Sequence, residues 1–251
     1  MRKPFQGVLN IIRFNWHYFL TSIILVITII FIYPEVSPIL AIGLKIVIIF
    51  LIFSTIISLI VSAYIYDFSH LYSLSWTDNS DQHKKQKIVN INAGFDETSV
   101  LIRQKFPAAD LYVFDFYNPD RHTEVSIKRA RRAYPPYPGT QSVSTSALTI
   151  ESNSAAKIFC IFSAHEIRDD AERILFFNEL HRILSDDGEI MITEHLRDVA
   201  NFLVYNIGFF HFHSKSKWMR TFYEAGLNVS RQIKITPFIT TFILQKNATS
   251  Y

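Results

Sequence analysis

The stretch IVNINAGFDETSVLI (residues 88–102) joins an apolar strand to an amphipathic helix through a short turn with a single glycine. In α/β folds such turns bind nucleotide cofactors, because backbone N–H groups and the start of the helix face the ligand. The candidate cofactor-binding residues here are Asn90, Asn92, Ala93, Gly94, Asp96 and Glu97. The turn is poor in glycine and rich in acid, so a working cofactor site, a decayed site and an ordinary strand–helix turn all stay open.

Further candidate residues stand where three other predicted strands end. The second strand ends in Asp115 and Phe116, and the third is followed by Thr145, Ser146 and Ala147. The fourth, an apolar run KIFCIF, is followed by Ser163, His165 and Glu166. Ligands of open α/β sheets bind beyond the carboxyl ends of the strands, which is where all these residues stand. The candidate catalytic residues are His165 and Glu166, as a general acid–base pair; a helix cap or a surface role explains them equally well.

The elements that must position these residues alternate along the chain from residue 87 onward. Predicted strands cover 87–92, 110–116, 140–146, 156–163 and 189–195, and predicted helices cover 98–106, 122–134, 170–184 and 218–227. Two further strands, 228–236 and 238–246, are joined by Pro237 and close the sequence of elements. Alternation of strands and helices is the pattern of a parallel α/β sheet.

The order of these segments, from about residue 88 to 246, resembles the class I S-adenosylmethionine (SAM)-dependent methyltransferases. The likeness rests on four segments, IVNINAGFDETS, LYVFD, HEIRDDAERILFFNELHRILSDDGEIMITEH and the closing WMRTFYEAGLNVSRQIKI…FITTFILQK. The third is the most specific, because a helix ending in ELHRIL, a DDG turn and the strand EIMITEH are similar to that family's helix-to-fifth-strand region. The resemblance implies a Rossmann-like, mostly parallel sheet with an antiparallel closing strand, and SAM as the cofactor.

The same resemblance implies roles for individual residues. The turn from Asn92 to Gly94 would wrap the methionine part of SAM, and Asp115 would accept hydrogen bonds from the ribose hydroxyls. Phe116 would lie against the adenine, whose amino group would meet the stretch from Thr145 to Ala147. The stretch from Ser163 to Glu166 would face the methyl group.

The first turn departs from the pattern of the family it resembles. That pattern is acid-x-Gly-x-Gly-x-Gly, and this chain has Asn90, Asn92, Gly94 and Asp96 at the four places. Asn90 brings no negative charge toward the α-ammonium of SAM, and Asn92 tolerates the left-handed backbone that glycine would adopt. Asp96 or Glu97 could replace the missing charge. The alternative is that both are ordinary first-turn acids that stabilise the helix dipole.

Two long apolar runs precede the α/β region. Residues 18–33 and 39–66 are long enough to cross a bilayer, with spans at about 17–34 and 40–65. We expect a membrane anchor over 1–72, a linker over 73–87 and a methyltransferase-like domain over 88–251. A signal peptide and the core hairpin of a soluble protein are the competing interpretations.

Positive charge predicts the orientation of this hairpin. Arg2, Lys3 and Arg13 precede the first span and three lysines between 84 and 87 follow the second, whereas the link between the spans carries none. Both termini and the α/β domain are therefore expected in the cytoplasm, in a multi-pass membrane protein whose residues 17–66 lie in the lipid bilayer.

Several other features exclude functions rather than suggest them. The near-even charge balance argues against a nucleic-acid partner. The single cysteine, Cys160, stands in an apolar strand, where a buried structural thiol is expected. His195, His211 and His213 are expected to be core or interfacial histidines, so no metal site is predicted. The aromatic segment 199–213 is either the wall of the acceptor pocket or an ordinary core helix.

The sequence thus favours a membrane-anchored SAM-dependent methyltransferase that acts from the cytoplasmic side on a lipid-like or otherwise hydrophobic acceptor. A catalytically inactive membrane protein that keeps the fold as a SAM-binding or scaffold module is the alternative, and the glycine-poor turn favours it. A nicotinamide-dependent reductase is the weaker third hypothesis, because its glycine fingerprint is absent.

Overall fold

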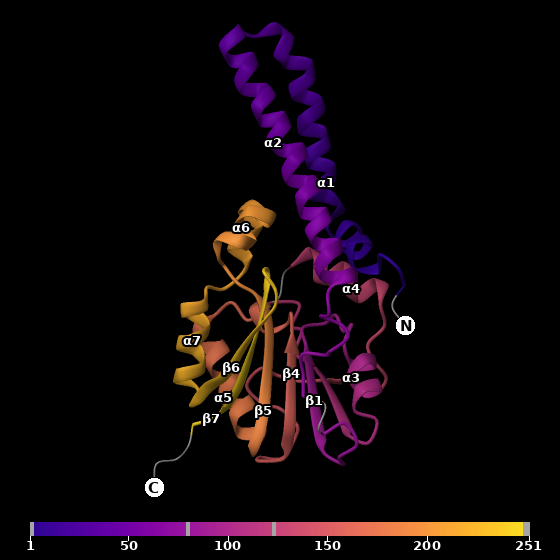
Figure 1. Ribbon diagram of the computed structural model, residues 1–251, viewed down its shortest axis with the longest axis vertical. Helices are drawn as coiled ribbons and strands as arrows, with labels where there is room; N and C mark the ends of the chain where they lie inside the picture. Colours follow the sequence, from indigo (N-terminus) through magenta and orange to yellow (C-terminus); the bar gives the residue numbers. More distant parts are fainter. Residues whose placement is uncertain (1–2, 79–80, 122–123, 248–251) are drawn as a thin grey trace.

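One seven-stranded sheet, with strand order β3-β2-β1-β4-β5-β7-β6, forms the centre of the α/β domain in the computed structural model, which describes residues 3–78, 81–121 and 124–247 (Figure 1). The strands are β1 Lys87–Asn92, β2 Asp110–Asp115, β3 Gln141–Ser142, β4 Ala155–Ile161, β5 Leu184–His195, β6 Leu227–Thr236 and β7 Ile239–Lys246. Only β7 runs antiparallel to its neighbours, β5 and β6. The predicted mostly parallel sheet with an antiparallel closing strand is therefore confirmed.

Helices cover both faces of the sheet because its buried strands alternate their side chains between the two faces. The helices of this domain are α3 Ser99–Lys105, α4 Val125–Ala133, α5 Asp170–Ile183, α6 Val199–Tyr205 and α7 Lys215–Glu224. In β1, Val89 packs into the core beneath α5 and α7, whereas its neighbour Ile88 packs into the core beneath α3. The register of β1 against β2 sets Asn92 beside Asp115, so the first two candidate sites meet at one edge of the sheet.

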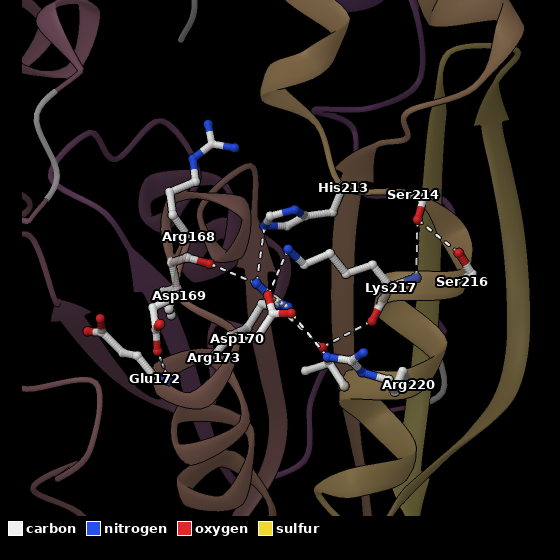
Figure 2. Close-up of polar contacts among 12 residues, drawn as sticks. Arg168, Asp169, Asp170, Glu172, Arg173, His213, Ser214, Ser216, Lys217 and Arg220 are labelled. Carbon is white, nitrogen blue, oxygen red and sulfur yellow. Dashed lines mark hydrogen bonds and ion pairs between the residues drawn. The ribbon is translucent and has the colours of Figure 1, made fainter.

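The pairing of α5 with α7 is organised around a buried arginine (Figure 2). Arg173 donates to Asp170 at 2.7 Å and to the hydroxyl of Thr221 at 3.1 Å. Lys217 and Arg220 of α7 also reach Asp170, at 2.7 and 3.0 Å. A buried guanidinium is tolerated only when its donors are paired, and this network pairs them across the helix interface.

The predicted hairpin is present as two long helices that stand out from the sheet domain (Figure 1). They are α1 Gln6–Ile32, followed by a short turn Tyr33–Glu35, and α2 Pro38–Ala63, which continues into a π-helical turn Tyr64–Phe68. Both helices are long and apolar enough to cross a membrane, and only 6% of the apolar window of each is buried. A core helix of a soluble protein would be mostly buried, so the exposed surface argues against that alternative.

Helix α1 has two parts that meet at Asn15, where the backbone leaves helical geometry. The part before Asn15 packs against the α/β domain, and the part after it is exposed and apolar. The predicted spans begin at 17 and 40, inside the helical stretches Gln6–Glu35 and Pro38–Phe68. The positive residue Arg2 lies outside the described residues, as do residues 122–123 of the predicted helix 122–134.

The two ends of the hairpin are joined to each other at its base, and the chain that follows them packs into the domain. The backbone N–H groups of Gly7 and Val8 donate to the two carboxylate oxygens of Asp67, at 2.7 and 2.9 Å. The stretch that follows α2 is also packed rather than extended: Leu74 is buried in the core under α3, and its carbonyl accepts from Lys105 at 2.7 Å. Residues that composition marks as a polar linker thus pack into the domain.

This close contact predicts the effect of a single methyl group. A Cβ added at Gly7 would lie 2.3 Å from Cβ of Tyr66, whereas one added at Gly43 would meet nothing within 4 Å. We expect Gly7→Ala to cost about 1–3 kcal/mol of unfolding free energy by overpacking. Gly43→Ala, also in a helix, should be neutral or slightly stabilising. Thermal unfolding of the full chain in detergent checks the pair, and equal melting temperatures would contradict the packing described.

Candidate functional site

The turn after β1 is built by side chains that bond to its own backbone. Asn92 ends β1, and its carbonyl oxygen Oδ1 accepts from the N–H of Gly94 at 2.9 Å. The left-handed residue is Gly94 itself, with φ of 94°. The single glycine therefore stands where the turn needs it, and Asn92 contributes a side-chain bond rather than the left-handed conformation suggested by the family pattern.

Asp96 lies two residues before Thr98, the N-cap of α3, and uses only one of its carboxylate oxygens on the backbone. Its Oδ1 accepts from the N–H groups of Thr98 and Ser99, both at 2.9 Å, which fixes the entry of the chain into the helix. Asn90 lies beneath it and donates to the hydroxyls of Ser99 and Thr98, at 2.8 and 3.0 Å. Neither Asp96 nor Glu97 is therefore a first-turn acid, because α3 begins at Ser99. Oδ1 of Asp96 bonds to the backbone, and its Oδ2 is left available.

Three buried polar atoms of this turn have no hydrogen-bond partner in the described structure. They are Oδ1 of Asn90, Nδ2 of Asn92 and Oδ2 of Asp96. Buried polar atoms are nearly always paired, so three such atoms at the end of β1 and in the turn after it can each bond to an ordered water or to a polar ligand. Two of the atoms are acceptors, which suit a cationic group of a ligand, and one is a donor, which suits an anionic group.

Glu97, the second acidic candidate, is engaged by the hairpin. Its two oxygens accept from Tyr72 at 2.8 Å and from Asn10 of α1 at 3.4 Å. The side-chain oxygen Oδ1 of Asn10 accepts a hydrogen bond from the hydroxyl of Tyr134 at 2.9 Å. Glu97 therefore joins the first turn to the base of the hairpin, a role that neither the family pattern nor the first-turn position predicts.

A cavity of about 200 Å³ lies between this turn and the first part of α1. Of the predicted site residues, Asn92, Ala93, Glu97 and Glu166 line it. Helix α1 forms the opposite wall with Asn10, Ile11 and Phe14, and the ring of Phe14 packs edge-on against Phe95 at 5.6 Å. The hairpin that the sequence presents as a separate anchor is thus part of the cavity, and sequence reasoning did not find these α1 residues.

Asp115 lies at the end of β2 as expected, but both of its carboxylate oxygens are already bonded. Oδ1 accepts from the N–H of Tyr117 at 2.8 Å, and Oδ2 accepts from Arg131 of α4. The Arg131 guanidinium also lies over the ring of Tyr117, 4.5 Å from its centre, and beside Gly94. Arg131 therefore fills the space between the first turn and the candidate ribose-binding acid.

The remaining predicted cofactor residues lie outside the cavity. Phe116 is buried against Phe176 in the core, at 5.4 Å between ring centres. Thr145 donates to Glu172 at 2.7 Å, while Ser146 and Ala147 are exposed. Ser163 is buried and donates to the carbonyl of Ile91 at 2.8 Å, which ties β4 to β1.

His165 and Glu166 follow β4 and form a buried ion-pair cluster. His165 Nδ1 lies 2.6 Å from Glu194, and its Nε2 lies 3.1 Å from Oε1 of Glu166. Burial alone would lower the pKa of His165, but the charges and hydrogen bonds of Glu194 and Glu166 outweigh it and raise the pKa to about 10. Burial would raise the pKa of Glu166, but His165 and His211 hold it well below its usual range. The pair is therefore a protonated histidine beside an ionised glutamate.

His211 completes this cluster, and the other two histidines do not. Ligand atoms of His165, Glu166 and His211 lie within 4.8 Å of one another, close enough to hold a metal ion. The guanidinium of Arg168 contacts both ring nitrogens of His211, so a positive charge already stands beside this site.

His195 and His213 are core histidines, as the sequence suggests. The ring of His195 is stacked between Phe162 and Phe212, and its Nε2 is hydrogen-bonded to the hydroxyl of Tyr66 at 2.8 Å. Burial lowers the pKa of His195 to about 4, so it is neutral. His213 lies in the buried network of Arg173, 3.4 Å from its Nη1 (Figure 2).

No family model and no curated protein matches this chain. Solved structures do match. N,N-8-amino-8-demethyl-D-riboflavin dimethyltransferase from Streptomyces davawensis has a TM-score of 0.51 at 10% identity over 74% of this chain and 56% of that one. A SAM-dependent methyltransferase from Methanosarcina mazei has a TM-score of 0.48 at 13% identity, over 65% and 93% of the two chains. One from Aquifex aeolicus has a TM-score of 0.47 at 13% identity, over 64% and 82%. With the strand order above, the chain has the fold of the class I SAM-dependent methyltransferases.

The charge state of the His165 cluster predicts a dependence of stability on pH. Because the folded protein raises the pKa of His165 above its unfolded value of 6.5 to about 10, its contribution is complete below pH 6.5 and is lost as the pH rises toward 10. His165→Gln removes one partner of a buried pair and should cost about 3–5 kcal/mol at pH 7.

We expect that difference between wild type and His165→Gln to shrink steadily between pH 7 and pH 10, as measured by chemical unfolding in detergent. His70→Gln, at an exposed histidine, is the matched control. A difference that stays constant over this range would mean that His165 is not protonated.

Proposed function

We propose that the protein is a membrane-anchored SAM-dependent methyltransferase whose α/β domain faces the cytoplasm and whose acceptor is hydrophobic or lipid-like. The fold supports SAM as the ligand class, and the contacts of the first turn and of α1 support a cavity that is still able to bind.

The observation that carries the proposal is the set of three unpaired polar atoms after β1. The amino-acid end of SAM carries an α-ammonium and a carboxylate. Nδ2 of Asn92, which lines the cavity, would donate to the carboxylate. Oδ2 of Asp96 and Oδ1 of Asn90, which lie beside Asn92 but do not line the cavity, would accept from an ammonium that enters beyond it. Asp96 thereby supplies the negative charge that Asn90 lacks, so this turn fits the cofactor despite its missing glycines.

SAM, when bound, supplies an electrophilic methyl carbon that forms a bond to the acceptor as its bond to sulfur breaks. For such a displacement the protein mainly aligns the acceptor and excludes water. Phe14, Phe95 and Phe162 are the apolar walls that exclude water from the cavity. Asn10 and Tyr72 hold Glu97, and with it the first turn, against α1.

The charge state of the cluster after β4 restricts the acceptor. His165 is protonated and the pKa of Glu166 is lowered, so neither is a base matched to the hydroxyl of an ordinary alcohol. An acceptor that is already nucleophilic, such as an unprotonated amine or an acidic enol or phenol, fits this site better. Glu166 lines the cavity and would orient such a group or hold its charge.

The membrane part of the proposal rests on the exposed apolar helices and on the charges near them. Exposed Lys128 and Arg132 of α4 and the half-buried Arg129 stand near the base of α1, where anionic lipid headgroups would meet them. Arg129 donates to the carbonyl of Phe14 at 2.6 Å and lies over the ring of Trp16, 5.1 Å from its centre. Tryptophan at this position suits the membrane–water interface.

A SAM-binding or scaffold protein without catalysis is the second candidate, and Arg131 is the observation that favours it. The cavity of about 200 Å³ is smaller than most ligand pockets. Beside it, Arg131 occupies the carboxylate of Asp115 that a ribose would contact. An active enzyme requires Arg131 to move aside. Arg131→Ala should then strengthen SAM binding by up to about fivefold, because the Arg131–Asp115 ion pair no longer has to break. A partly exposed ion pair contributes about 1 kcal/mol.

Titration of the full chain in detergent or nanodiscs with SAM, followed by calorimetry, tests the proposal. Asp96→Asn keeps an oxygen that can accept from the N–H groups of Thr98 and Ser99 but removes the negative charge, and Asp115→Ala removes the ribose acceptor. Each should weaken binding by about 1.5–3 kcal/mol, the range for a charge-assisted hydrogen bond. Asp120→Asn, at an exposed acid, is the control and should not change it.

The outcomes of this titration are distinct. No detectable binding at millimolar SAM contradicts the proposal and the SAM-binding scaffold alike. Binding with Arg131→Ala stronger than wild type and with methyl transfer to a membrane extract supports the enzyme. Binding without transfer to any extract fraction supports the scaffold.

A further inference from the structure

The segment from α6 to the 3-10 turn Asn206–His211 turns apolar side chains outward. Val199 is 74% exposed, Leu203 66%, Phe210 60% and Phe202 46%. None of these residues lines the cavity, so the segment does not form the acceptor pocket that its composition suggests. Large apolar side chains gathered on one protruding segment indicate a surface that is covered by something else.

The position of this segment identifies what covers it. Helix α6 contacts α2 and lies at the end of the domain from which the hairpin projects (Figure 1). The ring of Tyr205, at the end of α6, packs against His195 at 5.3 Å, and His195 is hydrogen-bonded to Tyr66 of the π-helical turn that ends α2. Residues 199–210 are therefore fixed near the level at which α2 meets the domain.

Cationic side chains stand at the base of this protruding segment. Arg197 is exposed, donates to the carbonyl of Phe212 at 2.8 Å and lies 5.8 Å from the ring centre of Phe210. Arg168, also exposed, donates to the carbonyl of His211. Exposed phenylalanine and leucine with arginine behind them form the composition of segments that lie in a membrane interface, where the rings enter the acyl boundary and the cations meet headgroups.

We propose that the segment Val199–His211 inserts the exposed side chains of Val199, Phe202, Leu203 and Phe210 into the bilayer surface as a third membrane contact, beside the two helices of the hairpin. The inference rests on the hairpin spanning the membrane, which is part of the proposed function. The third contact would prevent the domain from swinging about the base of the hairpin and would hold the carboxyl edge of the sheet at the membrane surface.

Site-specific fluorescence in vesicles tests the inference, because the only natural thiol, Cys160, is fully buried. The full chain carrying Leu203→Cys is labelled with an environment-sensitive NBD probe and reconstituted into phosphatidylcholine–phosphatidylglycerol vesicles. Nitroxide quenchers are placed at a shallow or a deep carbon of the lipid chains. Tyr223→Cys, at a residue that is 79% exposed on α7, is the matched control, and Ile24→Cys within α1 reports on the hairpin itself.

We expect the probe at Leu203 to lose most of its fluorescence to the shallow quencher and less to the deep one, since interfacial segments enter only about 5–10 Å. The probe at Tyr223 should lose none, and that at Ile24 should respond to the deep quencher. Phe210→Cys provides a second position and should behave as Leu203→Cys does.

Two results would overturn the inference while leaving the anchor intact. One is a Leu203 probe quenched no more than the Tyr223 probe although the Ile24 probe is quenched. The other is a Leu203 probe that is shielded from water but untouched by lipid quenchers, which would assign the surface to a second copy or another protein. An unquenched Ile24 probe would instead overturn the membrane hairpin, and the inference with it.

Discussion

The carboxylate of Asp67 is the contact on which the arrangement of the molecule depends. It accepts hydrogen bonds from the first free N–H groups of α1, those of Gly7 and Val8, which no other part of a helix can satisfy. Asp67 itself stands in the turn that ends α2. One side chain thus joins the two ends of the hairpin to each other, and the absence of a Cβ at Gly7 allows the two segments to touch.

Once α1 is fixed there, its first turns close the cavity beside the carboxyl ends of β1 and β4. The wall it contributes is both polar, through Asn10, and aromatic, through Phe14. A cofactor site that opened freely to water would leave the unpaired atoms after β1 hydrated and would need no such wall. The first turns of the hairpin are therefore part of the cavity, so the α/β domain separated from the hairpin lacks one wall of it.

The sheet and the place of the site could be predicted from sequence because they depend on local pattern. Apolar runs bounded by turns mark β1, β4 and β5, and the glycine of the first turn marks its left-handed residue. The third strand was predicted at 140–146 but pairs only over Gln141–Ser142, since an edge strand has one neighbour to specify its length. Contacts between distant segments could not be predicted: nothing near Glu97 indicates that Asn10 and Tyr72 bind it, and nothing near Asp115 indicates Arg131.

The most direct test of this account is the SAM dissociation constant of the full chain carrying Phe14→Ala, measured in nanodiscs. Phe14 is buried in the cavity wall, whereas Phe31, farther along the same helix, is 77% exposed and provides Phe31→Ala as the control. If α1 is part of the cofactor site, Phe14→Ala should weaken binding about tenfold (about 1.4 kcal/mol), because it removes a wall of the cavity, and Phe31→Ala should not change it. Equal affinities for the two variants and wild type would contradict the account.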